Sequence, residues 1–142
     1  MNEHDRTLIH NDKAPAPIGP YSQAIRSGNL VFVSGQLGLD PATGQLAGPD
    51  AATQTRLILR HLQAILEVAG SSLARVLKTT IYLTDLADFA EVNKVYAWAF
   101  PTDPPARSTV QVAALPKGAR VEIEVVAGVP THTASEFGSG LM

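Results

Sequence analysis

Residues 50–70, with the sequence DAATQTRLILRHLQAILEVAG, carry the pattern of one complete amphipathic helix. Asp50 is a typical N-cap residue, and Gly70 is typical of the position just after a helix C-terminus. Between them, apolar residues recur at helical spacing, namely Ile58, Leu62, Ile65, Leu66 and Ala69. We therefore predict a helix over 51–69. Its solvent side carries Arg56, Arg60 and Glu67, and we expect His61 to face solvent or a neighbouring molecule.

A strand and a second helix follow this segment. Residues 76–83 are rich in β-branched and apolar side chains and predict a strand. Asp85 can cap a helix over 87–99, which Pro101 and the prolines after it would end. The buried stripe that we predict on this helix consists of Phe89, Val92, Tyr96 and Ala99.

Shorter strands are predicted on both sides of this centre. They lie near 7–10 and at 22–25, 30–33, 107–113 and 120–127. Ser27-Gly28-Asn29 is a typical hairpin turn, and residues 115–118 connect the last two strands. The predicted order is therefore hairpin, helix, strand, helix, hairpin.

Two strand–helix–strand units with right-handed crossovers predict an α+β fold, a mixed sheet with both helices on one face. The strands at 30–33, 81–83 and 121–126 carry apolar or aromatic side chains on both faces. Such strands are normally buried on both faces, and no third helix is available to cover the second one. We therefore predict a closed homo-oligomer in which the uncovered sheet faces meet.

Composition limits the classes of protein to which the chain can belong. Its 142 residues suffice for one domain, which we place at 14–130, between an N-terminal segment, 1–13, and a tail at 131–142 that we expect to be disordered. The net charge of −2 argues against nucleic acid as the main partner, and the absence of cysteine excludes thiol nucleophiles and zinc–thiolate sites. No signal peptide or membrane-spanning stretch is present, which favours the cytoplasm.

Several familiar kinds of site are missing from the sequence. The four histidines, His4, His10, His61 and His132, are dispersed, so no metal site is predicted. No glycine-rich phosphate loop and no Gly-x-Ser-x-Gly motif occurs. Asp85 and Asp88 resemble a catalytic carboxylate pair, but helix capping explains both more simply. Trp98 is expected in the core or at an interface.

Three residues are candidates for chemistry, each with an ordinary alternative. Arg107 follows two prolines that stiffen the entry to a strand, and a guanidinium there can bind a carboxylate; the alternative is a surface arginine. Glu122 interrupts an apolar strand, where a carboxylate is paired, functional or simply solvated. Tyr21 follows Gly19-Pro20 and can form a pocket wall or pack in the ordinary way.

Several ordered segments together resemble the Rid (reactive intermediate deaminase) family, over about residues 14–127 and most closely its RidA-type branch. The N-terminal segments are APIGPYSQA at 16–24 and VSGQ at 33–36. The central segment is KTTIYLTDL at 78–86, followed by Phe89 and Asn93. The C-terminal segments are PARS at 105–108, LP at 115–116 and VEIE at 121–124.

This resemblance implies a chorismate-mutase-like fold and a homotrimer with its sheets around a central barrel. It also implies an enzyme without a cofactor, a deaminase of the 2-iminobutanoate/2-iminopropanoate type. Such an enzyme hydrolyses small enamine and imine acids, such as 2-aminoacrylate, to 2-keto acids and ammonia, in clefts between subunits.

The resemblance further implies a role for each matching residue. Arg107 would bind the substrate carboxylate, and Glu122 would position or activate the attacking water. The substrate-binding residues would be Tyr21, Ser34, Gly35, Asn93 and Thr109. Thr109 stands where some relatives carry cysteine, and it would act through its backbone N–H.

Two other functions remain open at this point. One is a non-catalytic module of the same fold that binds or senses a small metabolite. The other is a hydrolase acting on a related carbonyl or amide, because a fold does not fix a reaction. A binding module needs Arg107 but has less use for a carboxylate at Glu122, which favours the deaminase.

Overall fold

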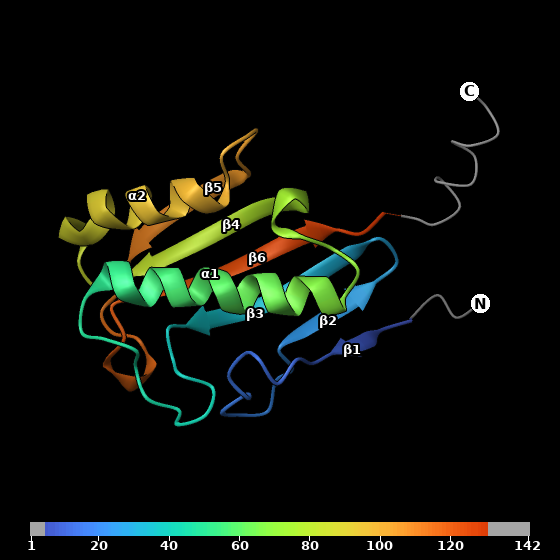
Figure 1. The fold of residues 1–142 in the computed structure, drawn as a ribbon, viewed down its shortest axis with the longest axis horizontal. Coiled ribbons are helices and arrows are strands. Elements are labelled where there is room, and N and C mark those ends of the chain that lie inside the picture. Colours follow the sequence, from blue (N-terminus) through green and yellow to red (C-terminus); the bar gives the residue numbers. More distant parts are fainter. Residues whose placement is uncertain (1–4, 131–142) are drawn as a thin grey trace.

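The computed structural model describes residues 5–130, which form one six-stranded sheet with two α-helices on one of its faces (Figure 1). The strands are β1 (Thr7–Ile9), β2 (Ala24–Ser27), β3 (Leu30–Leu37), β4 (Val76–Leu83), β5 (Ala106–Gln111) and β6 (Val121–Gly128). The helices are α1 (Ala51–Val68) and α2 (Phe89–Ala99), with short 3₁₀ turns η1 (Leu73–Arg75), η2 (Leu86–Asp88) and η3 (Pro116–Gly118). The predicted α+β class with a mixed sheet is confirmed. The tail at 131–142, His4 and His132 lie outside the described residues.

The last two strands do not form the hairpin that we predicted. The strand order is β1-β2-β3-β6-β4-β5, so β6 lies between β3 and β4, antiparallel to both, and β5 lies at the edge, parallel to β4. The crossover through α2 returns the chain on the outer side of β4, which leaves the inner side free for β6. Alternation along β6 predicts which side chains are buried, but it does not say which strands β6 pairs with.

Helix α1 begins at the predicted residue, Ala51, and ends at Val68, one residue before the predicted end. A carboxylate oxygen of Asp50 accepts a hydrogen bond from the backbone N–H of Thr53 at 2.9 Å, as an N-cap does. Gly70, with φ of 84°, donates to the carbonyl of Glu67, and Ser71 donates to that of Leu66. These two bonds form a Schellman motif, for which a positive φ is needed.

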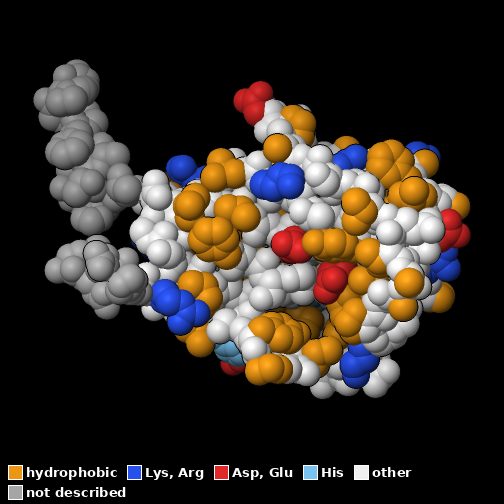
Figure 2. Space-filling model, turned by 180° about the vertical axis from the view of Figure 1, so that it is seen from behind, with side chains coloured by type: hydrophobic (Ala, Val, Ile, Leu, Met, Phe, Trp, Pro, Cys, Tyr) orange, Lys and Arg blue, Asp and Glu red, His pale blue; other side chains and the backbone are white. Residues whose placement is uncertain are grey.

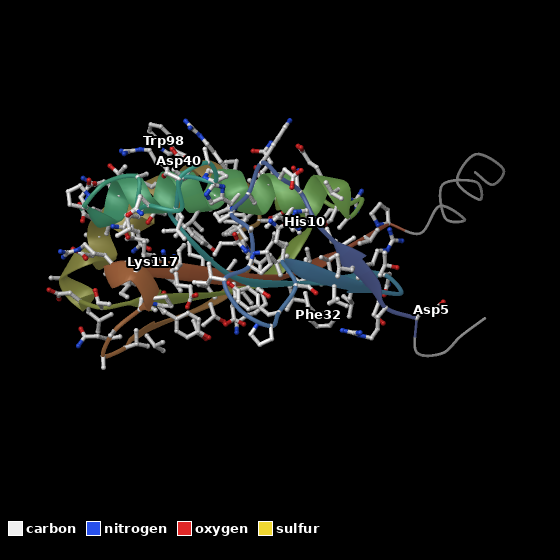
Figure 3. All side chains as sticks on the ribbon, turned by 90° about the horizontal axis from the view of Figure 1, so that it is seen from below. Asp5, His10, Phe32, Asp40, Trp98 and Lys117 are labelled. Carbon is white, nitrogen blue, oxygen red and sulfur yellow. The ribbon has the colours of Figure 1, made fainter. Side chains whose placement is uncertain are left out.

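Helix α2 is preceded by η2, and its buried face differs from our prediction. Val92, Val95 and Tyr96 are buried on this helix, whereas Phe89 is 39% exposed. The extra turn of η2 shifts the start of α2, so Phe89 lies at its first position, over the sheet edge. Trp98 is 83% exposed and projects away from the sheet (Figure 3), so it does not lie in the core, and its place at an interface stays a prediction.

Asp85 and Asp88 have different roles. The Asp85 side chain accepts from the N–H of Ala87 at 2.9 Å, which confirms it as a cap. Asp88 makes no capping bond, contrary to our prediction. Its carboxylate instead accepts two hydrogen bonds from the Arg120 guanidinium, at 2.9 and 3.1 Å. This bidentate pair ties the start of α2 to the residue before β6.

The core lies between the sheet and the two helices. Its most deeply buried side chains include Ile58, Leu62, Ile65, Leu66, Ile81, Leu83 and Ile123. His61 belongs to this layer as well: it is 1% exposed, and its Nε2 lies 2.8 Å from the carbonyl oxygen of Leu39. His61 therefore faces neither solvent nor another molecule in the single chain, and its role is structural. It links α1 to the loop after β3, and burial lowers its pKa.

The opposite face of the sheet has no helix over it in the single chain. Phe32 points out from it, on the side away from Trp98 (Figure 3). Leu8, Phe32 and Val110 are 64%, 47% and 42% exposed, and Figure 2 shows apolar side chains around acidic ones on this face. The uncovered apolar face that the sequence predicts is therefore present.

Candidate functional site

A β-bulge in β3 shapes the first part of the candidate site. Val33 pairs with Val125 and Gln36 pairs with Ile123, so two residues, Ser34 and Gly35, face one residue of β6 between these pairs. Bulges redirect side chains and interrupt a strand ladder. Ser34 anchors the bulge to the strand entry beside it, because its hydroxyl donates to the carbonyl of Ser22 at 2.7 Å.

The bulge places Gly35 directly against Glu122. A Cβ atom at position 35 would lie 2.7 Å from both Cδ and Oε2 of Glu122. Real Cβ atoms essentially never approach other atoms so closely, so any larger residue at this position would displace the carboxylate. The glycine thus leaves the space in which the Glu122 carboxylate sits.

Glu122 is half-buried on the sheet face away from the helices. Burial raises the pKa of its carboxyl, and the nearby negative charge of Glu124 raises it further. Glu124 itself accepts a hydrogen bond from the Tyr82 hydroxyl at 2.6 Å. Raising the pKa of a carboxyl group brings it closer to the range in which it can both accept and return a proton during a reaction.

The loop before β2 forms the wall opposite Glu122. The side chain of Gln23, 1% exposed, holds this loop through bonds to the backbone of Asn11, Ala14 and Pro15. The Tyr21 hydroxyl accepts a hydrogen bond from the N–H of Ile18 at 3.2 Å. Tyr21, Gly35 and Glu122 line one cavity of about 50 Å³. That volume holds one or two water molecules, at about 30 Å³ each.

Arg107 lies elsewhere, on the edge strand β5 and under α2. The central carbon of its guanidinium is 4.9 Å from the ring centre of Tyr96 and 5.5 Å from that of Phe89. Cation–π contacts of this kind hold a guanidinium flat without neutralising it. Within residues 5–130 its side chain forms no ion pair and no hydrogen bond. Arg107, Asn93 and Pro105 line a hollow of about 400 Å³.

Thr109 follows two residues later on the same side of β5. Arg107 pairs with Thr79 and Thr109 pairs with Ile81, both of which face the helices. Thr109 Oγ1 is buried and is the one such side-chain atom within residues 5–130 that has no hydrogen-bond partner. An unpartnered buried hydroxyl is uncommon and needs an explanation.

The predicted site residues therefore fall into two groups in the single chain. The first group, the carboxylate half-site, consists of Tyr21, Gly35 and Glu122, with Ser34 beside Tyr21 in the next hollow. The second group, the arginine half-site, consists of Asn93, Arg107 and Thr109. One points away from the helices and the other toward them, so the single chain does not bring all seven residues together.

Sequence reasoning missed several residues that shape these half-sites. Phe89 and Tyr96 were predicted as plain core residues, yet both hold the Arg107 guanidinium. The bond from Tyr82 to Glu124 joins neighbouring strands, and only the correct strand pairing would have predicted it. No group of three or more His, Asp or Glu side chains in residues 5–130 is arranged to hold a metal ion.

Comparison with known proteins assigns the family. The profile of the family described as endoribonuclease L-PSP, the YjgF/Rid family, matches residues 11–129, which is most of the chain. The chain belongs to the Rid family. Its resemblance to this family, inferred above from short motifs, is thereby confirmed.

Named Rid proteins cover nearly the same residues. The RutC family protein y4sK of Sinorhizobium fredii is 53% identical over 118 residues, which are 83% of this chain and 94% of that protein. Human 2-iminobutanoate/2-iminopropanoate deaminase is 46% identical over 136 residues, 95% of this chain and 99% of the human protein. The crystal structure of E. coli TdcF with bound serine is 42% identical, with a TM-score of 0.83 over 87% of this chain and 99% of that one.

Proposed function

We propose that this Rid protein is an enzyme that hydrolyses small 2-enamine and 2-imine acids, such as 2-aminoacrylate or 2-iminobutyrate, to 2-keto acids and ammonia. The observation that carries the proposal is that the Arg107 guanidinium is held in place but is not paired with a carboxylate within residues 5–130. The guanidinium contacts the rings of Tyr96 and Phe89 and has no carboxylate partner among the described residues, so it is ready for an anionic ligand. The name of the human relative, a 2-iminobutanoate/2-iminopropanoate deaminase, supports the same class of substrate.

The reaction needs little more than positioning and one proton acceptor. The substrate carboxylate binds Arg107, which fixes the neighbouring C=N carbon in place. Glu122 takes a proton from water as the oxygen attacks the carbon of the protonated imine, and the C=N electron pair moves to nitrogen, which becomes a neutral amine. Glu122 then returns this proton to the amine. The C–N bond breaks as the hydroxyl oxygen forms the C=O bond and gives its proton to the departing ammonia, so the products are the 2-keto acid and ammonium. None of these steps uses a cofactor or a metal.

We propose further that the two half-sites meet between copies of the chain, in a homotrimer whose sheets surround a central barrel. The apolar face of the sheet gives a physical reason for assembly, because side chains such as Phe32 and Val110 are exposed in the single chain. The cavity at Glu122, about 50 Å³, contains neither Arg107 nor Thr109 in the single chain. A neighbouring copy that presents Arg107 and Thr109 would complete and enlarge it.

Neither helix in residues 5–130 is long and apolar enough to cross a membrane. We place the activity in the cytoplasm, with a small imino acid as the partner and with neither nucleic acid nor membrane as a main one. A module of this fold that only binds a metabolite is the alternative. The raised pKa of Glu122 favours the enzyme, because binding alone does not require a proton acceptor there.

One assay separates these functions. A serine/threonine dehydratase generates the imine in place, and the rate of 2-keto acid formation is followed with and without the protein. We expect the full chain to accelerate the formation of keto acid and ammonia. Binding of the keto acid without any acceleration would support the metabolite-binding module and contradict the enzyme.

A further inference from the structure

The hydrogen bond from Tyr82 to Glu124 lies beside Glu122 and has no part in the reaction described above. Tyr82 pairs across β4 and β6 with Glu122, and Thr80 pairs with Glu124. The Tyr82 hydroxyl nevertheless reaches diagonally to Glu124, 2.6 Å away, and not to its direct neighbour. Diagonal contacts across antiparallel strands are within reach of aromatic side chains.

The two carboxylates consequently have unequal surroundings. Both point to the open face of β6, two residues apart, so they are neighbours of like charge. Glu124 accepts a short hydrogen bond from the phenol of Tyr82. Glu122 has no hydrogen bond or ion pair from any residue in 5–130, and it is packed against Gly35.

We infer that Tyr82 and Glu124 are positioning residues that keep one fixed negative charge beside Glu122, so that a proton entering this pair of carboxylates binds Glu122. The inference rests on the proposed function for its catalytic meaning, because it makes Glu122 the group that accepts and returns the proton. The pKa shifts agree with it: the bond to Glu124 raises the pKa of Tyr82 to about 12, and the charge of Glu124 adds to the effect of burial on Glu122.

The other charged and titratable groups around Glu122 do not offset this charge. Tyr21 faces it from the loop before β2, and Lys117 follows Pro116, which lines the same cavity. Lys78 shares the open face of β4 but pairs with Val126, further along the strand. No lysine within residues 5–130 forms an ion pair with Glu122. The bulge in β3 contributes no charge, and α1 and α2 lie on the other face of the sheet.

The test is a titration of the Glu122 carboxyl by carbon-detected NMR in the full-length protein, made on the wild type, Glu124→Gln, Tyr82→Phe and the control Glu67→Gln on the solvent side of α1. In Glu124→Gln we expect the pKa of Glu122 to fall by about half a unit or more, because a like charge has been removed. In Tyr82→Phe, which keeps the ring, the signals of both carboxyls should move over the same pH range. Glu67→Gln should match the wild type.

An unchanged Glu122 titration in Glu124→Gln would overturn the inference, and so would an unchanged separation of the two signals in Tyr82→Phe. The imine assay distinguishes this failure from failure of the proposed function. If the protein is a deaminase, the acidic limb of its pH–rate profile should shift to lower pH in Glu124→Gln. Alternatively, the titration shifts as expected while the wild-type protein does not accelerate imine decay. In that case the inference that the proton binds Glu122 stands, and the proposed deaminase function is contradicted.

Discussion

Arg107 and Glu122 point to opposite faces of the same sheet. Arg107 lies under α2, over the rings of Tyr96 and Phe89, whereas Glu122 alternates with Val121 and Ile123, which are buried under the helices. One small substrate cannot contact both side chains within a single chain. If both act on the same molecule, they come from different copies, and this arrangement makes the assembly part of the active site.

Mixed assemblies test this arrangement directly. Arg107→Ala and Glu122→Gln are each expected to have little activity alone, but a subunit of one variant can supply the side chain that its neighbour lacks. After random mixing in equal amounts, about a quarter of the sites should contain both side chains, and about a quarter of wild-type activity should return. Imine decay before and after subunit exchange measures this. No recovery in assemblies proven to be mixed would place both groups of one site on the same chain.

Substitution of Arg107 should weaken the binding of the transition state without disrupting the fold. We expect Arg107→Ala to lower kcat/KM by about 10²- to 10³-fold, comparable to the loss of one oxyanion-hole donor. Arg107→Lys keeps the charge but lacks the two-pronged donor geometry, so it should lie between Ala and wild type. Steady-state kinetics with Arg60→Ala, on the solvent side of α1, as control checks this. Equal rates in all four proteins would contradict the role of Arg107.

Gly35→Ala should displace the Glu122 carboxylate. The added methyl group would lie 2.7 Å from Cδ and Oε2 of Glu122, so the side chain has to move. Activity should fall at least tenfold while the circular dichroism spectrum stays that of wild type. Gly128→Ala is the matched control, because the nearest atom to its new methyl group, the carbonyl oxygen of Arg75, is 3.8 Å away. A fully active Gly35→Ala protein would show that Glu122 is not needed in this position.

Thr109→Val should distinguish the contribution of the Thr109 hydroxyl from that of the Thr109 backbone N–H. The hydroxyl is buried without a partner, so its replacement by a methyl group of similar shape should leave Tm unchanged or raise it. If only the backbone N–H holds the substrate, kcat/KM should stay within about threefold of wild type. Thermal unfolding and the imine assay measure the two effects. A large loss of kcat/KM with an unchanged Tm would assign the hydroxyl to the substrate.

His61 should make the fold less stable in mild acid. Burial lowers its pKa below the ordinary value of 6.5, so the folded state resists a proton that the unfolded state takes up. The free energy of unfolding should therefore be constant above about pH 6.5 and should fall as the pH decreases from there toward the folded pKa. Tm from about pH 7.5 to 5.5 should fall less in His61→Gln than in wild type or in the surface control His10→Gln. Equal slopes in all three proteins would contradict this account.

The sequence predicts local structure well where both ends of an element carry signals. Asp50 and Gly70 mark α1, and both make the bonds that their types suggest. The two faces of β6 are likewise predicted by alternation, with Val121, Ile123 and Val125 buried. In each case the interactions that determine the structure involve residues only a few positions apart in the chain.

Long-range pairing is the part that the sequence did not predict. Nothing in residues 106–128 says that β6 pairs with β3 and β4 while β5 takes the edge. For the same reason His61 was placed in solvent, because its partner is a carbonyl oxygen 22 residues earlier in the chain, at Leu39. Tyr21, Arg107 and Glu122 were candidates from their sequence context, whereas the other site residues and all of the roles came from a family resemblance. Their division into two half-sites depends on which way each strand faces and follows only from the structure.

The position of β6 also bears on how the chain is made. β3 and β4 do not pair with each other, because β6, which follows both in the sequence, lies between them. While the ribosome is still translating residues before Val121, the growing chain can form only two separate ladders, β1-β2-β3 and β4-β5. Each exposes strand edges that would pair with other chains. Nascent chains of this protein should therefore need protection until β6 has been synthesised.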